Sequence, residues 1–307
     1  MGLISDALKR AEQERKNKAQ SAPIQAHSAD PPQPVAPDDL VDLPPGLAAA
    51  MIDNKHTAIN APEWNPQPAG GVSAFNIHES VVAFHDKAAE ITEEYRSLRA
   101  RLTALNTTGE NQVIAITSSI PKEGKSVTTM NLAWVISEIK HFRVLMIDAD
   151  FRRSSLASMT GISEYPGLAD LLRGEARLEE VIRPTPVPNL HVIPAGTTQE
   201  FNAAELLSTQ KTAAVLDECR RRYQYCIVDT PPASTVSDAS VIGPLCTGVL
   251  FIVRMGKTPE PIAKSTIRLL QSNNVNILGC ILAGHRESTG RYRRYYYGYH
   301  KYYSDPY

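Results

Sequence analysis

The feature that most constrains this chain is an alternation of short apolar runs with helix-like segments from about residue 113 onwards. Six runs rich in Val, Ile and Leu have the length of strands and cover residues 113–117, 144–147, 190–193, 226–228, 249–253 and 277–282. Helix-like segments at 127–139, 203–222 and 260–273 lie between them. Continuous apolar runs separated by helices are typical of parallel strands with right-handed crossovers. We therefore expect a doubly wound, mostly parallel α/β fold.

The regions outside this alternation differ in composition. Residues 1–20 carry apolar side chains at helical spacing, which predicts a short amphipathic helix. That helix either packs on its own domain, frays, or docks on a partner or a membrane surface. Residues 21–79 hold all ten of the prolines that fall within the first 70 residues, so we expect a disordered linker there. The folded domain is expected at 80–284, and residues 285–307 form a tail with eight of the 12 tyrosines.

Charge and composition exclude several classes of protein. The 32 Lys and Arg residues nearly balance the 33 Asp and Glu residues, so the chain lacks the basic field that drives non-specific nucleic-acid binding. The longest apolar runs, such as 248–253, are far shorter than the ~20 residues that cross a bilayer. The four cysteines form no C-x-x-C pair, which argues against a zinc site or a disulfide framework, so we expect all four to be small buried hydrophobic residues. We expect a cytoplasmic protein that does not bind nucleic acid.

A phosphate-binding loop is predicted between the first strand and the helix that follows it. The residues there read S-S-I-P-K-E-G-K-S over 118–126, with Ser119 where a full Walker A motif has Gly. Backbone N–H groups and the positive helix end cradle phosphates in such a loop, while Lys125 reaches the outer phosphates and the Ser126 hydroxyl ligates Mg²⁺. The expected nucleotide-binding residues are Ser119, Pro121, Lys122, Glu123, Gly124, Lys125, Ser126 and Val127.

Acidic residues follow two of the predicted strands. Asp148 and Asp150 come after the run at 144–147, and Asp229 comes after the run at 226–228. Ligands of open α/β sheets bind at the carboxyl ends of the strands, where these side chains emerge. Asp229 opens a D-T-P-P segment with the form of a Walker B motif and is expected to hold Mg²⁺ through water, beside Ser126. A single such acid often only caps a helix, but three of them facing one phosphate loop favour a nucleotide site.

Four motifs together resemble one protein family. The residues I-D-A-D-F-R at 147–152 resemble the second Walker-type motif of the bacterial tyrosine kinases (BY-kinases) of capsule and exopolysaccharide biosynthesis. The spacing of Glu93, Arg96 and Arg99 resembles the E-x-x-R-x-x-R assembly motif of that family, D-T-P-P its Walker B motif, and the tail its terminal tyrosine cluster. The resemblance covers about 81–307. The opening M-G-L-I-S-D-A-L resembles the subgroup associated with exosortase-type exopolysaccharide loci.

The resemblance implies an ATP- and Mg²⁺-dependent protein-tyrosine autokinase, of the non-specific protein-tyrosine kinase type, that regulates exopolysaccharide biosynthesis or export. Lys125 would bind the ATP phosphates, and Ser126, Asp150 and Asp229 would hold the metal. Asp148 would activate the tyrosine hydroxyl, since a phenol with a pKa near ~10 is a poor nucleophile at neutral pH. Arg152 would either stabilise phosphate or pair with Asp148 or Asp150.

It further implies a homo-oligomeric ring in which each subunit phosphorylates the tail of its neighbour. Glu93, Arg96 and Arg99 would lie at the interface, whereas a pair between Glu93 and Arg96 within one helix is the alternative explanation. The acceptors would be Tyr292, Tyr295, Tyr296, Tyr297, Tyr299, Tyr302, Tyr303 and Tyr307. A separate transmembrane polysaccharide co-polymerase would activate the kinase at the inner face of the plasma membrane, and a cognate tyrosine phosphatase would oppose it.

Alternative functions remain open on the sequence alone. Lys122 stands where the family commonly has Gly, which places a Cβ at a position that favours positive φ. This departure would lower turnover and leave a catalytically weak, ATP-binding assembly regulator, or it would tighten ATP. A partitioning-type ATPase shares the fold, but its signature lysine position is occupied by Ile120. The tail would serve as a substrate, as a basic aromatic segment that stacks on single-stranded nucleic acid, or as a low-complexity tail.

Overall fold

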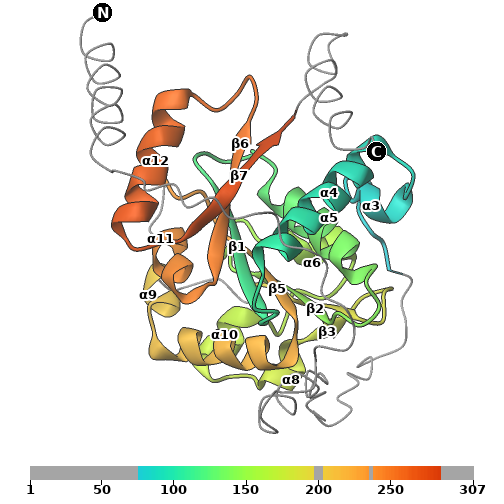
Figure 1. The fold of residues 1–307 in the computed structure, drawn as a ribbon. Helices are drawn as coiled ribbons and strands as arrows, with labels where there is room; N and C mark the ends of the chain where they lie inside the picture. Colours follow the sequence, from blue (N-terminus) through green and yellow to red (C-terminus); the bar gives the residue numbers. More distant parts are fainter. Residues whose placement is uncertain (1–74, 197–202, 235–237, 285–307) are drawn as a thin grey trace, which may run out of the picture. The chain divides into compact units, whose positions relative to one another are not determined.

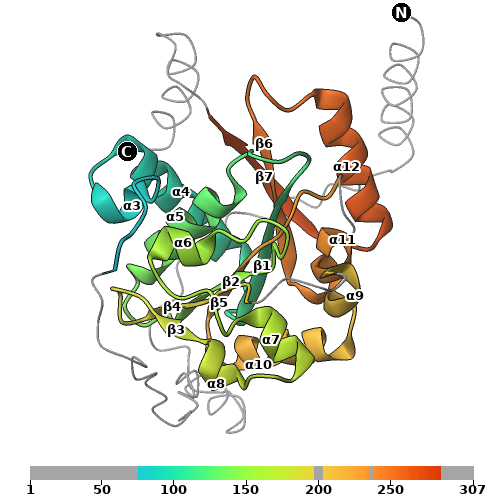
Figure 2. The ribbon, with the colours of Figure 1, turned by 180° about the vertical axis from the view of Figure 1, so that it is seen from behind.

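The computed structural model describes residues 75–196, 203–234 and 238–284. These residues all belong to a compact unit formed by residues 60–307, while the second unit, Met1–Ile59, lies outside the described residues. The predicted N-terminal helix, most of the predicted linker and the tyrosine tail also lie outside them. The described residues form one sheet with helices on both faces (Figure 1; Figure 2).

The sheet has seven strands in the order β3-β4-β2-β5-β1-β6-β7. The strands are β1 (Gln112–Ser118), β2 (Val144–Asp148), β3 (Arg183–Pro184), β4 (Leu190–Ile193), β5 (Tyr225–Asp229), β6 (Gly248–Arg254) and β7 (Ile277–Ala283). Every neighbouring pair is parallel except β3 and β4. The expected doubly wound, mostly parallel α/β fold is therefore confirmed. The two-residue β3 was not expected, because Arg and Pro carry no strand pattern.

Helices cover the two faces of the sheet in separate groups. One face packs against α3 (Val82–His85), α4 (Glu90–Leu105), α5 (Lys125–Ser137) and α6 (Leu156–Thr160). The other packs against α7 (Leu168–Arg173), α8 (Leu178–Val181), α9 (Ala203–Leu207), α10 (Gln210–Arg222), α11 (Asp238–Ile242) and α12 (Glu260–Ser272). Between α11 and β6 the chain makes a short 3₁₀ helix, Gly243–Leu245.

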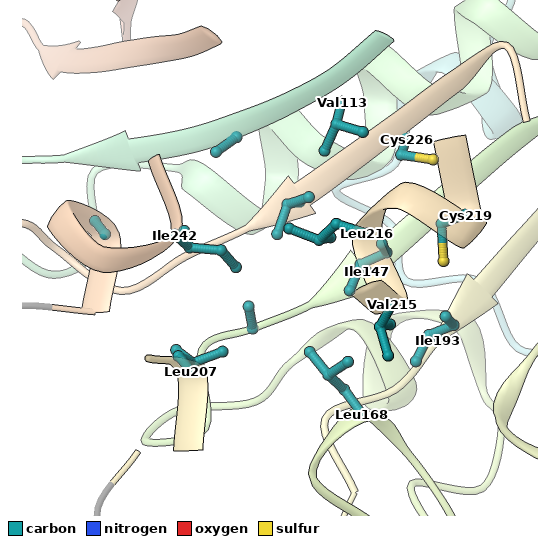
Figure 3. Close-up of a cluster of buried hydrophobic side chains, with 14 of the residues drawn as sticks. Val113, Ile147, Leu168, Ile193, Leu207, Val215, Leu216, Cys219, Cys226 and Ile242 are labelled. Atoms are coloured by element: carbon teal, nitrogen blue, oxygen red, sulfur yellow. The ribbon is translucent and has the colours of Figure 1, made fainter. Parts of the chain in front are cut away.

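Alternation along the strands divides the core into two clusters. Val113 and Ile147 point toward α10 and pack near Leu216 (Figure 3), whereas Ile114 and Met146 belong to the cluster beneath α5. Burying each such side chain stabilises the fold by roughly 1.5–3 kcal/mol before the entropy of ordering is subtracted. Because the central strands are buried on both faces, they appear in the sequence as continuous apolar runs.

Three local features differ from the sequence-based expectations. The expected helix at 203–222 is interrupted at Ser208 and Thr209 and forms α9 and α10 instead. Ile77, assigned to the linker, is buried in the core cluster beneath α5. Cys280 is exposed on the edge strand β7, whereas all four cysteines were expected to be buried. Leu282 on the same strand is 64% exposed.

Strand order places the candidate site. The chain runs outward from β1 to β2 and then returns to insert β5 between them, so β2, β5 and β1 are neighbours. The carboxyl ends of these three strands therefore meet at the point where the order reverses, which is where ligands of open α/β sheets bind. Among the residues that the structure describes, no helix is long and apolar enough to cross a membrane.

Candidate nucleotide-binding site

The phosphate loop lies where the sequence predicts it, between β1 and α5. The helix begins at Lys125, and the Thr128 N–H donates to the carbonyl of Gly124 at 2.8 Å. Gly124 has a φ of 102°, a conformation that glycine adopts without strain. Lys125 is buried, and the Ser119 hydroxyl is buried without a hydrogen-bond partner in the described residues. An unsatisfied buried hydroxyl beside a helix N-terminus suits a loop that receives an oxygen-rich ligand.

Lys122 adopts the backbone conformation that its position was expected to favour. Its φ is 64°, in the left-handed region that costs an L-residue about 1–2 kcal/mol. The carbonyl oxygen of Lys122 accepts from the Arg254 guanidinium at 2.9 Å and from the Lys257 ammonium at 3.1 Å. Contacts from the turn after β6 thus help to hold the loop in this conformation.

The side chain of Glu123 is used inside the protein. It is fully buried, and one carboxylate oxygen accepts from the N–H of Ile120 at 2.9 Å. The other oxygen accepts from the Thr258 hydroxyl, which itself accepts from the Arg254 N–H at 2.8 Å. Glu123 was expected among the nucleotide-binding residues. Its carboxylate ties the phosphate loop to the turn between β6 and α12.

Asp229 lies in the strand between the phosphate loop and Asp148. The register pairs it with Ile116 of β1 and with Asp148 of β2. Both carboxylate oxygens are buried, and neither accepts a hydrogen bond within the described residues. Burial and then the charge of Asp148 raise the pKa of Asp229 well above its usual range, although the Ser126 hydroxyl and the Lys125 ammonium lie near enough to oppose this. A bound cation would relieve the unfavourable burial.

Asp148 organises the loop that follows β2. It is fully buried, and its Oδ1 accepts from the Asp150 N–H at 3.2 Å, while its Oδ2 accepts from the N–H groups of Ser155 and Leu156, both at 3.0 Å. Burial raises the pKa of Asp148 to about 7, against the opposing effect of these N–H groups. A carboxylate has about four acceptor positions, so the three donors leave one position open on Oδ1.

Arg152 pairs with a residue that the sequence did not single out. Its Nε lies 3.5 Å from Oδ2 of Asp238, the first residue of α11. The salt bridge of Arg152 is thus with Asp238, whereas the sequence suggested Asp148 or Asp150 as its partner. Asp238 is buried and its Oδ1 lacks a hydrogen-bond partner in the described residues, and burial raises its pKa while Arg152 lowers it. Asp150 is nearly buried and accepts from the Arg153 N–H at 3.1 Å.

The described residues contain no group of three or more His, Cys, Asp or Glu side chains arranged to hold a metal ion. Mg²⁺ is commonly held in nucleotide sites by one or two protein oxygens, with phosphate and water completing the coordination. The Ser126 hydroxyl and the unpartnered carboxylate of Asp229 provide such oxygens. The donor set therefore fits a metal that arrives with a nucleotide better than a metal caged by protein alone.

The predicted assembly residues converge on a carboxylate of their own chain. Arg96 bonds to Glu93 and contacts both oxygens of Glu138, at 2.9 and 2.5 Å. Arg99 contacts Glu138 at 2.8 Å and also the carbonyl of Val135. Glu138 follows α5, and the arginines hold its pKa below the usual range. Sequence spacing found the pair within the helix but missed Glu138, which lies 42 residues from Arg96.

The tyrosines expected to accept phosphate all lie outside the described residues.

Sequence reasoning missed several side chains that shape the phosphate loop, because their contacts join distant segments. The Ser234 hydroxyl donates to the carbonyl of Ser119, and Thr258 lies 135 residues from its partner Glu123. Ser234 could have been found from the sequence, because it follows the D-T-P-P motif by two residues.

Comparisons with known proteins agree with this geometry. A family described as "AAA domain" matches residues 111–242. The chain is 36% identical over 201 residues, 65% of its length, to the tyrosine-protein kinase ptk of Acinetobacter johnsonii. It is 32% identical over 192 residues, 62% of its length, to the succinoglycan biosynthesis transport protein ExoP of Rhizobium meliloti. The matches span only 27% and 24% of those two longer proteins.

A solved structure extends the likeness over most of a kinase domain. The chain superposes on the kinase domain of the Escherichia coli tyrosine kinase ETK with a TM-score of 0.63 and 32% sequence identity. The match covers 69% of this chain and 84% of that domain. The motifs at the ends of β1, β2 and β5 lie together at the carboxyl edge of the sheet. The chain therefore belongs to the family of bacterial tyrosine kinases.

Proposed function

We propose that this chain is an ATP-dependent protein-tyrosine kinase that transfers the γ-phosphoryl group of ATP to tyrosines of its own tail. One observation supports this most directly. The buried, unpartnered carboxylate of Asp229 stands between the phosphate loop and Asp148, which is the arrangement that a metal-nucleotide complex and an acceptor hydroxyl require. Family membership supports the choice of tyrosine as the acceptor.

The residues that would hold Mg-ATP follow from the site. The loop N–H groups and Lys125 would bind the phosphates, and Ser126 and Asp229 would hold the metal. Asp150 lies near enough to affect the pKa of Asp229. The metal supplies charge neutralisation on the phosphate oxygens when it is bound. Lys125 is buried, so its ammonium acts in a partly desolvated setting where it stabilises negative charge more strongly than in water.

Asp148 is the residue that we assign to the acceptor tyrosine. The phenol oxygen attacks the γ-phosphorus, the bond from that phosphorus to the β–γ bridging oxygen breaks, and ADP leaves. The phenolic proton passes to Asp148. Its pKa of about 7 lets it be ionised near neutral pH yet basic enough to accept a proton, and Oδ1 has one acceptor position left.

The wider arrangement belongs to the same proposal. Transfer occurs between subunits of a ring, with the tail of one chain entering the site of its neighbour, and the kinase regulates exopolysaccharide biosynthesis or export. The printed name of the relative ExoP supports the link to a polysaccharide. A transmembrane co-polymerase would recruit the kinase from the cytoplasm to the membrane, and a tyrosine phosphatase would reset it.

Intact mass spectrometry tests the proposal. The full chain is dephosphorylated, incubated with Mg-ATP, and compared with Lys125→Met and Asp148→Asn. We expect a ladder of phosphates that maps to residues 292–307 and that both variants lack. Unmodified tyrosines in a protein that binds ATP, even with a membrane activator added, would reject the kinase assignment.

The strained Lys122 supports a second candidate, an ATP-binding assembly regulator with negligible turnover. A Cβ in a left-handed loop conformation makes productive phosphate geometry harder to reach. The test is Lys122→Gly. If strain limits turnover, the variant gains phosphotransfer at least severalfold while the wild-type chain shows little, and equal high rates in both would remove this candidate.

A further inference from the structure

Three exposed cationic residues lie in the phosphate loop or contact its backbone. They are Lys122, Arg254 and Lys257, which we call the cationic rim. The Arg254 guanidinium lies 2.9 Å from the carbonyl oxygen of Lys122, and the Lys257 ammonium lies 3.1 Å from the same oxygen and 3.3 Å from that of Pro121. The rim therefore joins one end of the phosphate loop to the turn after β6.

No salt bridge within the described residues neutralises the rim. Glu123 is the acidic residue that follows Lys122 in the loop, and it is fully buried. Its carboxylate oxygens accept hydrogen bonds from the Ile120 N–H and the Thr258 hydroxyl. Arg254 and Lys257 donate to neutral carbonyls instead of to carboxylates. Two cations on the backbone of a third cationic residue, with no acid paired to them in the described residues, make a local positive potential that attracts an anion.

Two of the three rim residues, Arg254 and Lys257, lie outside the cradle for the nucleotide. A phosphate loop faces its ligand with backbone N–H groups. Arg254 and Lys257 donate to carbonyl oxygens of the loop. They therefore contact the negative end of its peptide groups, opposite to the N–H groups that face a phosphate. The two cations thus lie beside the nucleotide cradle and are not part of it.

The described chain ends against the rim. The Met255 N–H donates to the carbonyl of Ala283 at 2.9 Å, and a Cβ built on Gly284 would lie 3.3 Å from Cγ and 3.4 Å from Nε of Arg254. The tail therefore starts beside the guanidinium. Tyr292 follows eight residues later, within a reach of about 26–29 Å for extended chain.

Phosphorylation would change the sign of the tail. Residues 285–307 contain five Arg and Lys and two Asp and Glu, which gives a side-chain charge of +3 with His neutral, so the unmodified tail is repelled by the rim. Each phosphotyrosine adds about −1.5 to −2 at pH 7, and two of them are enough to cancel that charge.

We propose that the cationic rim is a phosphotyrosine-binding site for the tail of the same chain. The proposal depends on the tail phosphorylation given above. Arg254 supplies the planar donor that binds phosphate oxygens in pairs, and the two lysines supply point charges. Because the tail is tethered at Gly284, its phosphotyrosines reach the rim at an effective concentration on the order of millimolar. A tail bound at its own rim is withdrawn from the neighbouring subunit.

A synthetic peptide separates this binding from kinase activity. The peptide covers residues 290–299, is labelled with a fluorophore, and carries phosphotyrosine at positions 295, 296 and 297 or no phosphate. Binding to the dephosphorylated full chain is measured by anisotropy, with and without a saturating non-hydrolysable Mg-ATP analogue. The test variant is Arg254→Gln with Lys257→Gln, whose amides keep a donor for the loop carbonyls while removing both charges. Lys264→Gln on α12 is the matched control, since Lys264 is paired with Glu260.

We expect the phosphopeptide to bind the wild-type chain and the control alike, and the double variant at least about tenfold more weakly. Nucleotide should leave this binding unchanged. Equal binding of the two peptides, equal binding to wild type and double variant, or displacement by nucleotide would each overturn the proposal. The phosphate is supplied already attached, so a chain without kinase activity would still give the expected result.

Discussion

At the scale of single residues, the site brings together two aspartates whose ionised forms are destabilised by burial. Asp148 and Asp229 face each other in the register of β2 and β5, and both are fully buried. Burial raises both pKa values, to about 7 for Asp148 and well above the usual range for Asp229. The folded protein without ligand therefore retains protons that the unfolded chain releases near pH 4.

This proton uptake predicts a stability that falls as pH rises. Between about pH 4 and 7 the folded state binds more protons than the unfolded state, so the free energy of unfolding decreases across that window. We expect Asp229→Asn, measured by urea unfolding without Mg²⁺ or nucleotide, to flatten the slope and to stabilise the protein at pH 7.5 by about 1–3 kcal/mol. Asp217→Asn on exposed α10 is the control and should leave the slope unchanged. A slope in Asp229→Asn as steep as that of the wild-type chain would contradict this account, since Asp148 alone should give a smaller one.

Lys122 gives a second prediction at this scale. Its positive φ disfavours β-branched residues most strongly. Lys122→Val should lower the free energy of unfolding by about 1–2 kcal/mol, whereas Lys122→Gly should change it by less than about 1 kcal/mol, because relief of strain offsets the greater entropy of unfolded glycine. Chemical denaturation of the two variants measures the difference. Equal stabilities would mean that the loop relaxes to another conformation.

At the scale of elements, the turn between β6 and α12 acts as a support for the phosphate loop. Thr258→Val would leave Glu123 with a buried carboxylate oxygen lacking its donor, and the Arg254 N–H lacking its acceptor. We expect a loss of about 1–3 kcal/mol in stability and weaker binding of a fluorescent ATP analogue, with both restored in Thr258→Ser. Unchanged nucleotide affinity in Thr258→Val would show that the turn is not needed to shape the loop.

Elements also show which parts of the structure the sequence can specify. The strands at the centre of the sheet were predicted to within about two residues at each end, since burial on both faces makes each one a continuous apolar run. The break at Ser208 and Thr209 was missed because helix spacing continues across it, although Thr209 is a suitable N-cap residue. Asp238 and Thr258 could not be found, since their partners are 86 and 135 residues away.

At the scale of the whole molecule, the proposed assembly would compete with bonds inside the chain. Arg96 and Arg99 already contact Glu138, so any interface that uses them must replace those contacts. We expect the double variant Arg96→Ala and Arg99→Ala to sediment as a monomer while still binding ATP, and Arg101→Ala on the same helix to sediment like wild type. Partly exposed pairs such as these contribute only about 0–1 kcal/mol each, so the double variant should remain folded.

Glu138→Gln separates the two roles of these arginines. It weakens the internal contacts and leaves both guanidinium groups in place. If the arginines serve an interface, sedimentation velocity should show assembly at a lower protein concentration than for wild type. Weaker assembly in Glu138→Gln would mean that the internal contacts hold α4 in the shape that the interface needs.

The open edge of the sheet affects how such sedimentation data must be collected. Cys280 is the exposed cysteine on β7, and β7 forms no strand pair on its outer side within the described residues. Two molecules that meet along this edge would bring their thiols together, and slow air oxidation would then trap them as a covalent dimer. Partial burial raises the pKa of this thiol, which slows the reaction but does not prevent it. Samples stored without a reducing agent would therefore contain dimers that mimic the proposed oligomer, and Cys280→Ser would identify them.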